Sequence, residues 1–142
     1  MEKELINISQ PLQEIFDQLI DLLGEKKAEC KISPECMVEG NRILVEIMLT
    51  NLLMNAWRHT NADAKIVISL SPAELVVSNT GSLALNPEKL FRRFSTASVQ
   101  TPGTGLGLSI VKEICNRYGW TVGYNFTDLM HVFTVSFKNQ LI

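Results

Sequence analysis

Polar side chains interrupt an apolar stretch at spacings that place them on one side of a helix. Residues 41–60 are largely apolar, and the later half of this stretch carries Asn51, Asn55, Arg58 and His59. In an α-helix, positions i, i+4, i+7 and i+8 share one stripe. A buried amide without a hydrogen-bond partner costs about 1–3 kcal/mol. The stripe therefore indicates either internal partners for these side chains or a ligand site.

A glycine-rich segment leads directly into another amphipathic stretch. Its sequence is Gly103-Thr104-Gly105-Leu106-Gly107-Leu108. Glycines let backbone N–H groups approach phosphate oxygens, and a helix N-terminus adds about half a unit of positive charge. The glycine spacing fits neither the dinucleotide-binding GxGxxG pattern nor the P-loop with its lysine. Alone, the segment is as consistent with a flexible turn as with a phosphate site.

Two further segments indicate little by themselves. Ser78-Asn79-Thr80-Gly81 follows an apolar strand, where asparagine and glycine can simply form a turn. Phe91 and Phe94 stand three residues apart before a stretch of small polar residues, and such a pair is more typical of core packing.

The elements that position these residues follow from the hydrophobic periodicity. Helical spacing from Leu12 to Leu23, with Gly24 behind it, predicts a first helix, and Asn41 is the predicted N-cap of a buried helix ending near Thr60. Further helices are predicted at 87–91 and from Leu108 to Cys115. Strands are predicted at 30–32 and 36–38 around a Ser33-Pro34 turn, at 66–70 and 75–77 as a hairpin, and at 122–124 and 132–137 around Thr127-Asp128. This order predicts an α+β fold, one mixed sheet with helices on one face.

Length, charge and cysteine usage narrow the class of protein. The 142 residues suffice for one domain, and 13 Lys and Arg against 15 Asp and Glu give a net charge of −2. We expect no nucleic-acid partner, since no basic cluster exceeds a pair. Three cysteines without metal or redox spacing predict reduced thiols. No apolar run approaches the roughly 18 residues of a membrane span, so we expect a cytoplasmic domain, cut from a parent protein associated with the membrane.

In combination and in this order, the four segments resemble the ATP-binding catalytic domain of bacterial sensor histidine kinases. These kinases belong to the GHKL ATPase superfamily, which also includes gyrase, the heat-shock chaperone and mismatch-repair MutL. Residues 51–60 resemble the N box, 79–81 the first glycine box and 91–94 the F box, and GTGLGLSIVKEI at 103–114 matches the second glycine box nearly letter for letter. The resemblance spans roughly residues 5–138. It implies a Bergerat-type α/β sandwich with a mixed, mostly antiparallel sheet, forming one domain over 1–142 with 1–8 as a linker end.

The resemblance also implies roles for the polar residues. Asn55, with Asn51 helping, would hold the Mg²⁺ that bridges the ATP phosphates, while Arg58 and His59 would face the phosphates and ribose. The triphosphate cradle and the adenine region would comprise the following residues: Gly103, Thr104, Gly105, Leu106, Gly107 and Leu108 for the cradle, and Asn79, Gly81 and Thr134 for the base. Thr134, on a late strand, is the weaker assignment.

Departures from the family pattern bear on the chemistry. The family usually has Asp at position 79, whose carboxylate accepts from the adenine amine, and the neutral Asn79 is expected to lower adenine affinity. Leu83 and Trp120 replace usual glycines without removing a phosphate contact. Hydrolytic members of the superfamily carry a water-activating Glu at position 51, where this chain has Asn51. The pattern therefore predicts phosphoryl transfer to an external nucleophile rather than hydrolysis.

The implied nucleophile is a histidine outside the chain. His59 belongs to the nucleotide site by resemblance, and His131 begins a strand, where a structural role is expected. The substrate histidine is therefore expected in an upstream dimerisation domain, with relay to a response regulator. Without the dimerisation helices we expect a monomer, although the apolar stripe from Leu12 to Leu23 could mediate contacts.

Two other functions stay open at the level of the sequence. A nucleotide-binding regulatory module, or pseudokinase, would bind ATP without transferring phosphate, and Asn79 is the residue that favours it. A serine kinase acting on an anti-sigma antagonist shares the same boxes. The first helix, which resembles a continuation from an upstream domain, favours the histidine kinase over this serine kinase.

Overall fold

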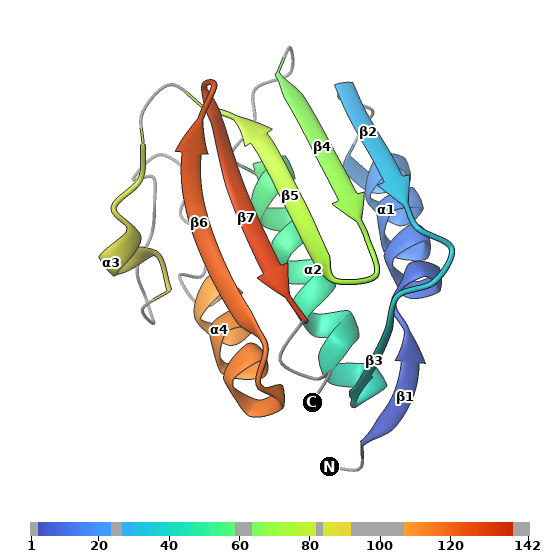
Figure 1. The fold of residues 1–142 in the computed structure, drawn as a ribbon. Coiled ribbons are helices and arrows are strands. Elements are labelled where there is room, and N and C mark those ends of the chain that lie inside the picture. Colours follow the sequence, from blue (N-terminus) through green and yellow to red (C-terminus); the bar gives the residue numbers. More distant parts are fainter. Residues whose placement is uncertain (1–2, 24–26, 59–63, 82–83, 92–106, 138–142) are drawn as a thin grey trace.

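The computed structural model describes residues 3–23, 27–58, 64–81, 84–91 and 107–137. Figure 1 shows one twisted sheet with α1, α2 and α4 packed against the same face. The strand order is β2-β4-β5-β7-β6, in which β2 and β4 are parallel and all other neighbours are antiparallel. The predicted α+β class, with a mixed, mostly antiparallel sheet covered on one side, is confirmed.

The helices and strands have the following bounds along the chain: β1 (Glu4–Asn7), α1 (Ser9–Leu23), β2 (Lys27–Ile32), β3 (Met37–Gly40), α2 (Arg42–Arg58), β4 (Lys65–Leu70), β5 (Glu74–Thr80), α3 (Pro87–Leu90), α4 (Gly107–Tyr118), β6 (Thr121–Thr127) and β7 (Met130–Ser136). Helix α2 connects the parallel strands β2 and β4, as a parallel pair requires a long crossover.

The two strands predicted around the Ser33-Pro34 turn are present as β2 and β3, and they do not pair with each other. Strand β3 instead pairs with β1 in a separate two-stranded sheet, with Ile6 opposite Val38. The side chain of Asn7 holds this corner, because its Oδ1 accepts from the backbone N–H groups of Ser9 and Cys36 at 3.2 and 3.1 Å. Strand β1 has only four residues, too few to show a period in the sequence.

Helix α2 begins at the predicted cap. The Oδ1 of Asn41 accepts from the N–H of Leu44 at 3.1 Å, and its carbonyl accepts from Val45 at 2.9 Å, so one side chain satisfies a free donor of the first turn. The prediction that α2 is buried on all sides is wrong for the side of the helix that carries Ile43 and Ile47, which are 59% and 38% exposed. Helices α1 and α4 flank α2 and leave that stripe uncovered.

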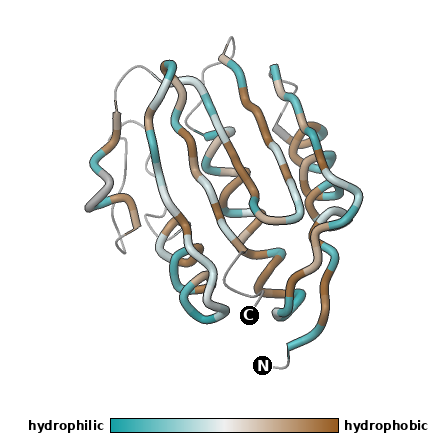
Figure 2. The backbone as a smooth tube through the Cα atoms, in the orientation of Figure 1, coloured by the Kyte–Doolittle hydropathy of each residue, from teal (hydrophilic) through white to brown (hydrophobic). Residues whose placement is uncertain are grey.

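The core lies between the sheet and the helices. Alternate residues of β4, β5 and β7 are buried, as the twofold period of a strand requires, and Figure 2 shows apolar colour recurring along the strands and helices. Helix α1 contributes Leu12, Phe16 and Leu19, and the ring of Phe16 meets Trp57 of α2 edge-on at 5.8 Å. The apolar stripe of α1, which from the sequence could mediate contacts with other molecules, therefore packs mainly inside the domain.

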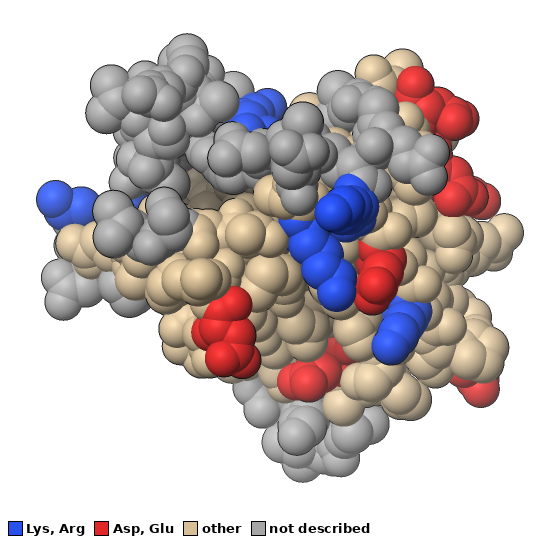
Figure 3. All heavy atoms as spheres, turned by 90° about the horizontal axis from the view of Figure 1, so that it is seen from above, with Lys and Arg blue, Asp and Glu red and all other residues tan. Residues whose placement is uncertain are grey.

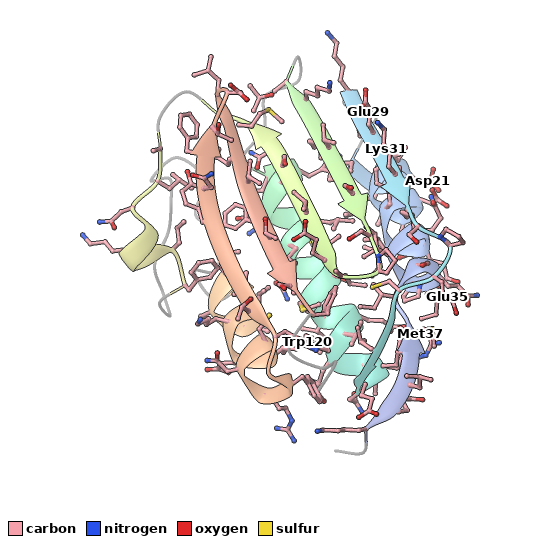
Figure 4. All side chains as sticks on the ribbon, in the orientation of Figure 1. Asp21, Glu29, Lys31, Glu35, Met37 and Trp120 are labelled. Carbon is pink, nitrogen blue, oxygen red and sulfur yellow. The ribbon has the colours of Figure 1, made fainter. Side chains whose placement is uncertain are left out.

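Helix α4 ends on a glycine in the left-handed region. Gly119 has a φ of 76°, and the N–H of Trp120 donates to the carbonyl of Cys115 at 2.9 Å, which closes the helix with a Schellman motif. Trp120 is buried against Tyr118 and Phe137 at the lower end of the sheet, where Figure 4 labels it. The replacement of a family glycine by Trp120 thus serves the core.

Candidate functional site

The elements that carry the predicted site converge toward one end of the sheet. Figure 1 shows α2 ending where β5 ends and β7 begins, at the top of the view, and the N-terminus of α4 is directed toward the same end. The predicted site residues that the structure describes at this end of the sheet are Asn51, Asn55 and Arg58 of α2, Asn79 and Gly81 at the end of β5, and Gly107 and Leu108 of α4.

Asn51 of α2 meets the first residue of α4. A Cβ added to Gly107 would lie 3.1 Å from Oδ1 of Asn51, which is tighter than ordinary van der Waals contact. The Nδ2 of Asn51 donates to the carbonyl of Ile47 at 2.8 Å, so the amide is held with its oxygen toward Gly107. The N-box-like helix and the second glycine-box-like segment are therefore adjacent, and Gly107 permits their close approach.

Asn55 and Arg58 continue the same stripe of α2. Asn55 is half-buried and Arg58 is exposed, so the stripe passes from the neighbourhood of α4 to the surface. Within the described residues the side chain of Asn55 makes no hydrogen bond. This stripe is the one that the flanking helices leave uncovered. The amides predicted to be core anomalies thus stand where a ligand can reach them.

Asn79 is the most buried polar residue of this end. It is 1% exposed, and its Nδ2 has no hydrogen-bond partner within the described part of the chain. Its register partners are Ile66 on β4 and His131 on β7, and all three face the helices. A buried amide donor without an acceptor is costly in a folded chain, which marks Asn79 as a candidate for contact with a ligand.

His131 lies beside Asn79 and against Gly81. A Cβ on Gly81 would overlap the Nε2 of His131, so the glycine is required by this contact. The Nδ1 of His131 lies 2.8 Å from the hydroxyl of Tyr124, which accepts from the N–H of Leu85 at 2.9 Å. Either the hydroxyl or Nδ1 donates in this hydrogen bond, according to which ring nitrogen carries the proton. Burial also lowers the pKa of His131, which favours the neutral form.

Aromatic rings extend this corner toward α3. Phe91 meets Phe133 of β7 edge-on at 6.3 Å, and Phe133 lies 5.1 Å from the ring of Tyr124. Phe91, the first residue of the F-box-like segment, therefore packs on the sheet. The hydrogen bond from the N–H of Leu85 to the hydroxyl of Tyr124 fixes the segment before α3 to the neighbouring strand β6.

Thr134 lies on the other face of the sheet. The buried residues of β7 are His131, Phe133 and Val135, and Thr134 alternates with them. Its register partners are Val76 and Gly123, on the side away from the helices. The assignment of Thr134 to the base pocket is corrected by this alternation. The β7 residue beside Asn79 is His131, which was expected to be structural. Alternation alone would have found it once the register was known.

Five of the predicted site residues cannot be placed in the structure. His59, Gly103, Thr104, Gly105 and Leu106 lie outside the described residues, as does Phe94 of the F-box-like segment.

Other chemistries have little support in the described residues. Cys30, Cys36 and Cys115 are free thiols, and burial raises the pKa of Cys115 to about 12. Such thiols are poor nucleophiles. Within the described ranges no group of three His, Cys, Asp or Glu side chains could hold a metal ion, and none of the described helices is long and apolar enough to cross a membrane. Figure 3, which views the domain from above, shows positive and negative side chains interspersed on that face.

Comparison with known proteins identifies the family. Residues 40–140 match the family described as histidine kinase-, DNA gyrase B-, and HSP90-like ATPase. The sensor histidine kinase HprS of Escherichia coli strain K12 is 30% identical over 95% of this chain, and CusS of E. coli O157:H7 is 30% identical over 85%. The chain spans 31% and 27% of the lengths of these two relatives.

Solved structures agree with the sequence relatives. The nucleotide-free catalytic domain of the histidine kinase ThkA superposes with a TM-score of 0.82 at 25% identity, covering 96% of this chain and 95% of that domain. The mycobacterial sensor histidine kinase MprB shares the fold, with a TM-score of 0.81 at 19% identity over 93% of this chain and 95% of that one. The chain belongs to the histidine kinase-, DNA gyrase B- and HSP90-like ATPase family, as an ATP-binding catalytic domain of the sensor histidine kinase type.

Proposed function

We propose that this domain binds ATP with Mg²⁺ at the end of the sheet described above. It would transfer the γ-phosphoryl group to a histidine in an upstream dimerisation domain. The observation that carries the proposal is the contact between Asn51 and Gly107, since it joins the polar stripe of α2 to the N-terminus of α4. An oxygen ligand for a cation and a positive helix end for phosphate thus stand next to each other.

The donor set fits magnesium. Mg²⁺ is a hard cation that takes oxygen ligands, usually a few from the protein together with phosphate oxygens and water. The nitrogen of Asn51 donates to the carbonyl of Ile47, its oxygen has no hydrogen bond among the described residues, and Asn55 stands one turn further along the same stripe. Asn55, with Asn51 helping, would hold the ion. When bound, the ion neutralises charge that develops on the transferring phosphate.

The protein's own groups position the nucleotide. The N-terminus of α4 presents backbone N–H groups at Gly107 and Leu108, and Arg58 adds a positive charge at the exposed end of the stripe. His59 and the segment from Gly103 to Leu106 are proposed to complete the phosphate contacts. Asn79, Gly81 and their β7 neighbour are proposed to face the base. Full-length ShkA, solved in complex with AMPPNP, shares this fold with a TM-score of 0.72 at 19% identity.

At position 51, within the described part of the site, the chain has no base to activate water. Asn51 is an amide that neither takes up nor releases a proton near neutral pH, and its nitrogen is already engaged with Ile47. Transfer to an external imidazole is thus favoured over hydrolysis. Neither His59 nor the buried His131 is proposed as the acceptor, because His131 is held by Tyr124 inside the domain.

The partners follow from this assignment. We infer that the parent protein supplies the histidine-containing dimerisation domain and passes the phosphoryl group to a response regulator, and that this piece is a monomer and a cytoplasmic domain of a membrane-associated parent. The support is that the matched sensor kinases are about three times longer than the chain.

Nucleotide affinity tests the metal assignment. Asn55→Ala is expected to weaken binding of ATP in the presence of Mg²⁺ by tenfold or more, about the loss expected for a charge-assisted ligand. Isothermal titration calorimetry measures it. Asn116→Ala, on the exposed face of α4, is the matched control and should bind as the wild type does. Equal affinities for Asn55→Ala and the control would remove Asn55 from the site.

Transfer in trans tests the reaction. The chain with ATP and Mg²⁺ should phosphorylate a supplied histidine-containing dimerisation domain on that histidine, and should not phosphorylate itself. If nucleotide binds but no histidine is ever phosphorylated, the regulatory, pseudokinase function is correct instead. Asn79 is the observation that favours this second function.

A further inference from the structure

The buried amide of Asn79 differs from a carboxylate in what it can recognise. A carboxylate only accepts hydrogen bonds, whereas an amide has one accepting oxygen and one donating nitrogen. Asn79 is 1% exposed and its donor has no partner among the described residues. The nitrogen therefore needs an acceptor from a ligand, or the chain bears the cost of leaving it unpaired.

A second polar ring lies at the same corner. The Nδ1 of His131 is hydrogen-bonded to the hydroxyl of Tyr124 at 2.8 Å, and its Nε2 lies against Gly81. His131 is the register partner of Asn79 on β7, so the two side chains stand side by side on the buried face. This corner thus presents the donor and the acceptor of the Asn79 amide, beside an imidazole whose Nε2 donates or accepts according to the ring tautomer.

The two common purine types differ at the atoms such a corner would meet. Adenine carries a donating amine on C6 and an accepting N1, whereas hypoxanthine and guanine carry an accepting oxygen on C6 and a donating N1. The amide of Asn79 can match either edge, because rotation by about 180° about its last torsion exchanges the oxygen and the nitrogen. A carboxylate would instead oppose the C6 oxygen with a second acceptor.

We propose that Asn79 is a specificity-determining residue that opens the base site to 6-oxopurine nucleotides, so that the domain binds inosine and guanosine nucleotides as well as adenosine nucleotides. This inference rests on the proposed nucleotide site and concerns only the choice of base.

ADP and IDP are the probes that isolate the feature, because their bases differ only in the C6 substituent and the proton on N1. Calorimetry of the 142-residue chain with Mg²⁺ should give dissociation constants for ADP and IDP within about threefold of each other. In Asn79→Asp, IDP should bind at least about thirtyfold more weakly than ADP, which is the discrimination expected from one bidentate contact. Asn125→Asp, exposed on β6, is the matched control and should keep the wild-type ratio.

Each outcome decides a different claim. A wild-type chain that binds ADP but binds IDP more than thirtyfold more weakly overturns the base inference and leaves the ATP site intact. A ratio near one that Asn79→Asp does not change also overturns it, because another group then sets the selectivity. A chain that binds neither nucleotide overturns the proposed site itself. The wild-type ratio needs no variant, so it stays informative even where Asn79→Asp does not fold.

Discussion

Replacing Gly81 by alanine is the sharpest test of the corner between β5 and β7. The added Cβ would overlap the imidazole of His131, and that ring cannot retreat freely because Nδ1 is bonded to the hydroxyl of Tyr124 at 2.8 Å. Moving the ring breaks this partly buried hydrogen bond, which costs about 1 kcal/mol. Crowding in a packed region adds about 1–3 kcal/mol. We therefore expect Gly81→Ala to lower the free energy of unfolding by about 2–4 kcal/mol.

Gly123 on β6 provides the matched control. A Cβ there would have no atom within 4 Å, and the residue lies in a strand of the same sheet. Gly123→Ala should change stability by no more than about 0.5 kcal/mol, as surface substitutions usually do. Urea denaturation of the wild type and both variants measures the difference.

The double variant Gly81→Ala/His131→Ala separates crowding from any other effect of the alanine. Removing the ring makes room for the new methyl group, so the two substitutions together should cost at least about 1 kcal/mol less than the sum of each alone. Additive costs, or a Gly81→Ala variant as stable as Gly123→Ala, would refute the close contact between Gly81 and His131.

Two further predictions concern stability. Leu129→Gly should raise the free energy of unfolding by about 0.5–1 kcal/mol. Leu129 is 62% exposed and has a φ of 58°, beside Asp128 with a φ of 53°, and a turn with these angles favours glycine. An unchanged midpoint of urea denaturation would contradict this prediction. Burial lowers the pKa of His131 in the folded state, so the unfolded chain binds the proton more tightly and stability should fall as the pH drops below about 6.5, levelling off below the folded-state pKa. The His131→Gln variant, measured by urea denaturation between pH 5 and pH 8, should lose this component, and an identical pH dependence in both proteins would contradict it.

Local patterns predicted most of the elements. Helix α2 begins at Asn41 as expected, and the hairpins β4–β5 and β6–β7 join strands only a few residues apart, so their pairing follows from the sequence. The pairs β1–β3 and β2–β4 could not be predicted in this way. They join residues such as Glu4 with Gly40 and Lys27 with Lys65, which only the packing of intervening helices brings together.

The candidate site was predicted unevenly for the same reason. Resemblance placed Asn51 and Gly107 in one site, and the structure brings them into contact. Thr134 and His131 are three residues apart on one strand, and their faces depend on a register that the sequence does not fix. The prediction from the sequence therefore chose Thr134, which lies on the face of the sheet away from the helices.

Asn79, Gly81 and His131 contribute to the stability of the fold and also lie where the base is proposed to bind. Experiments on these residues must therefore separate a loss of stability from a loss of binding. A substitution such as Gly81→Ala that loosens the contact with His131 will lower the fraction of molecules able to bind, and every measured affinity falls by that fraction. Weak ATP binding by such a variant is therefore no proof that Gly81 touches nucleotide. The ratio of IDP to ADP affinity is different, since both ligands share the same folded population and the fraction cancels. A change in that ratio at Asn79 can arise only from the contact with the base.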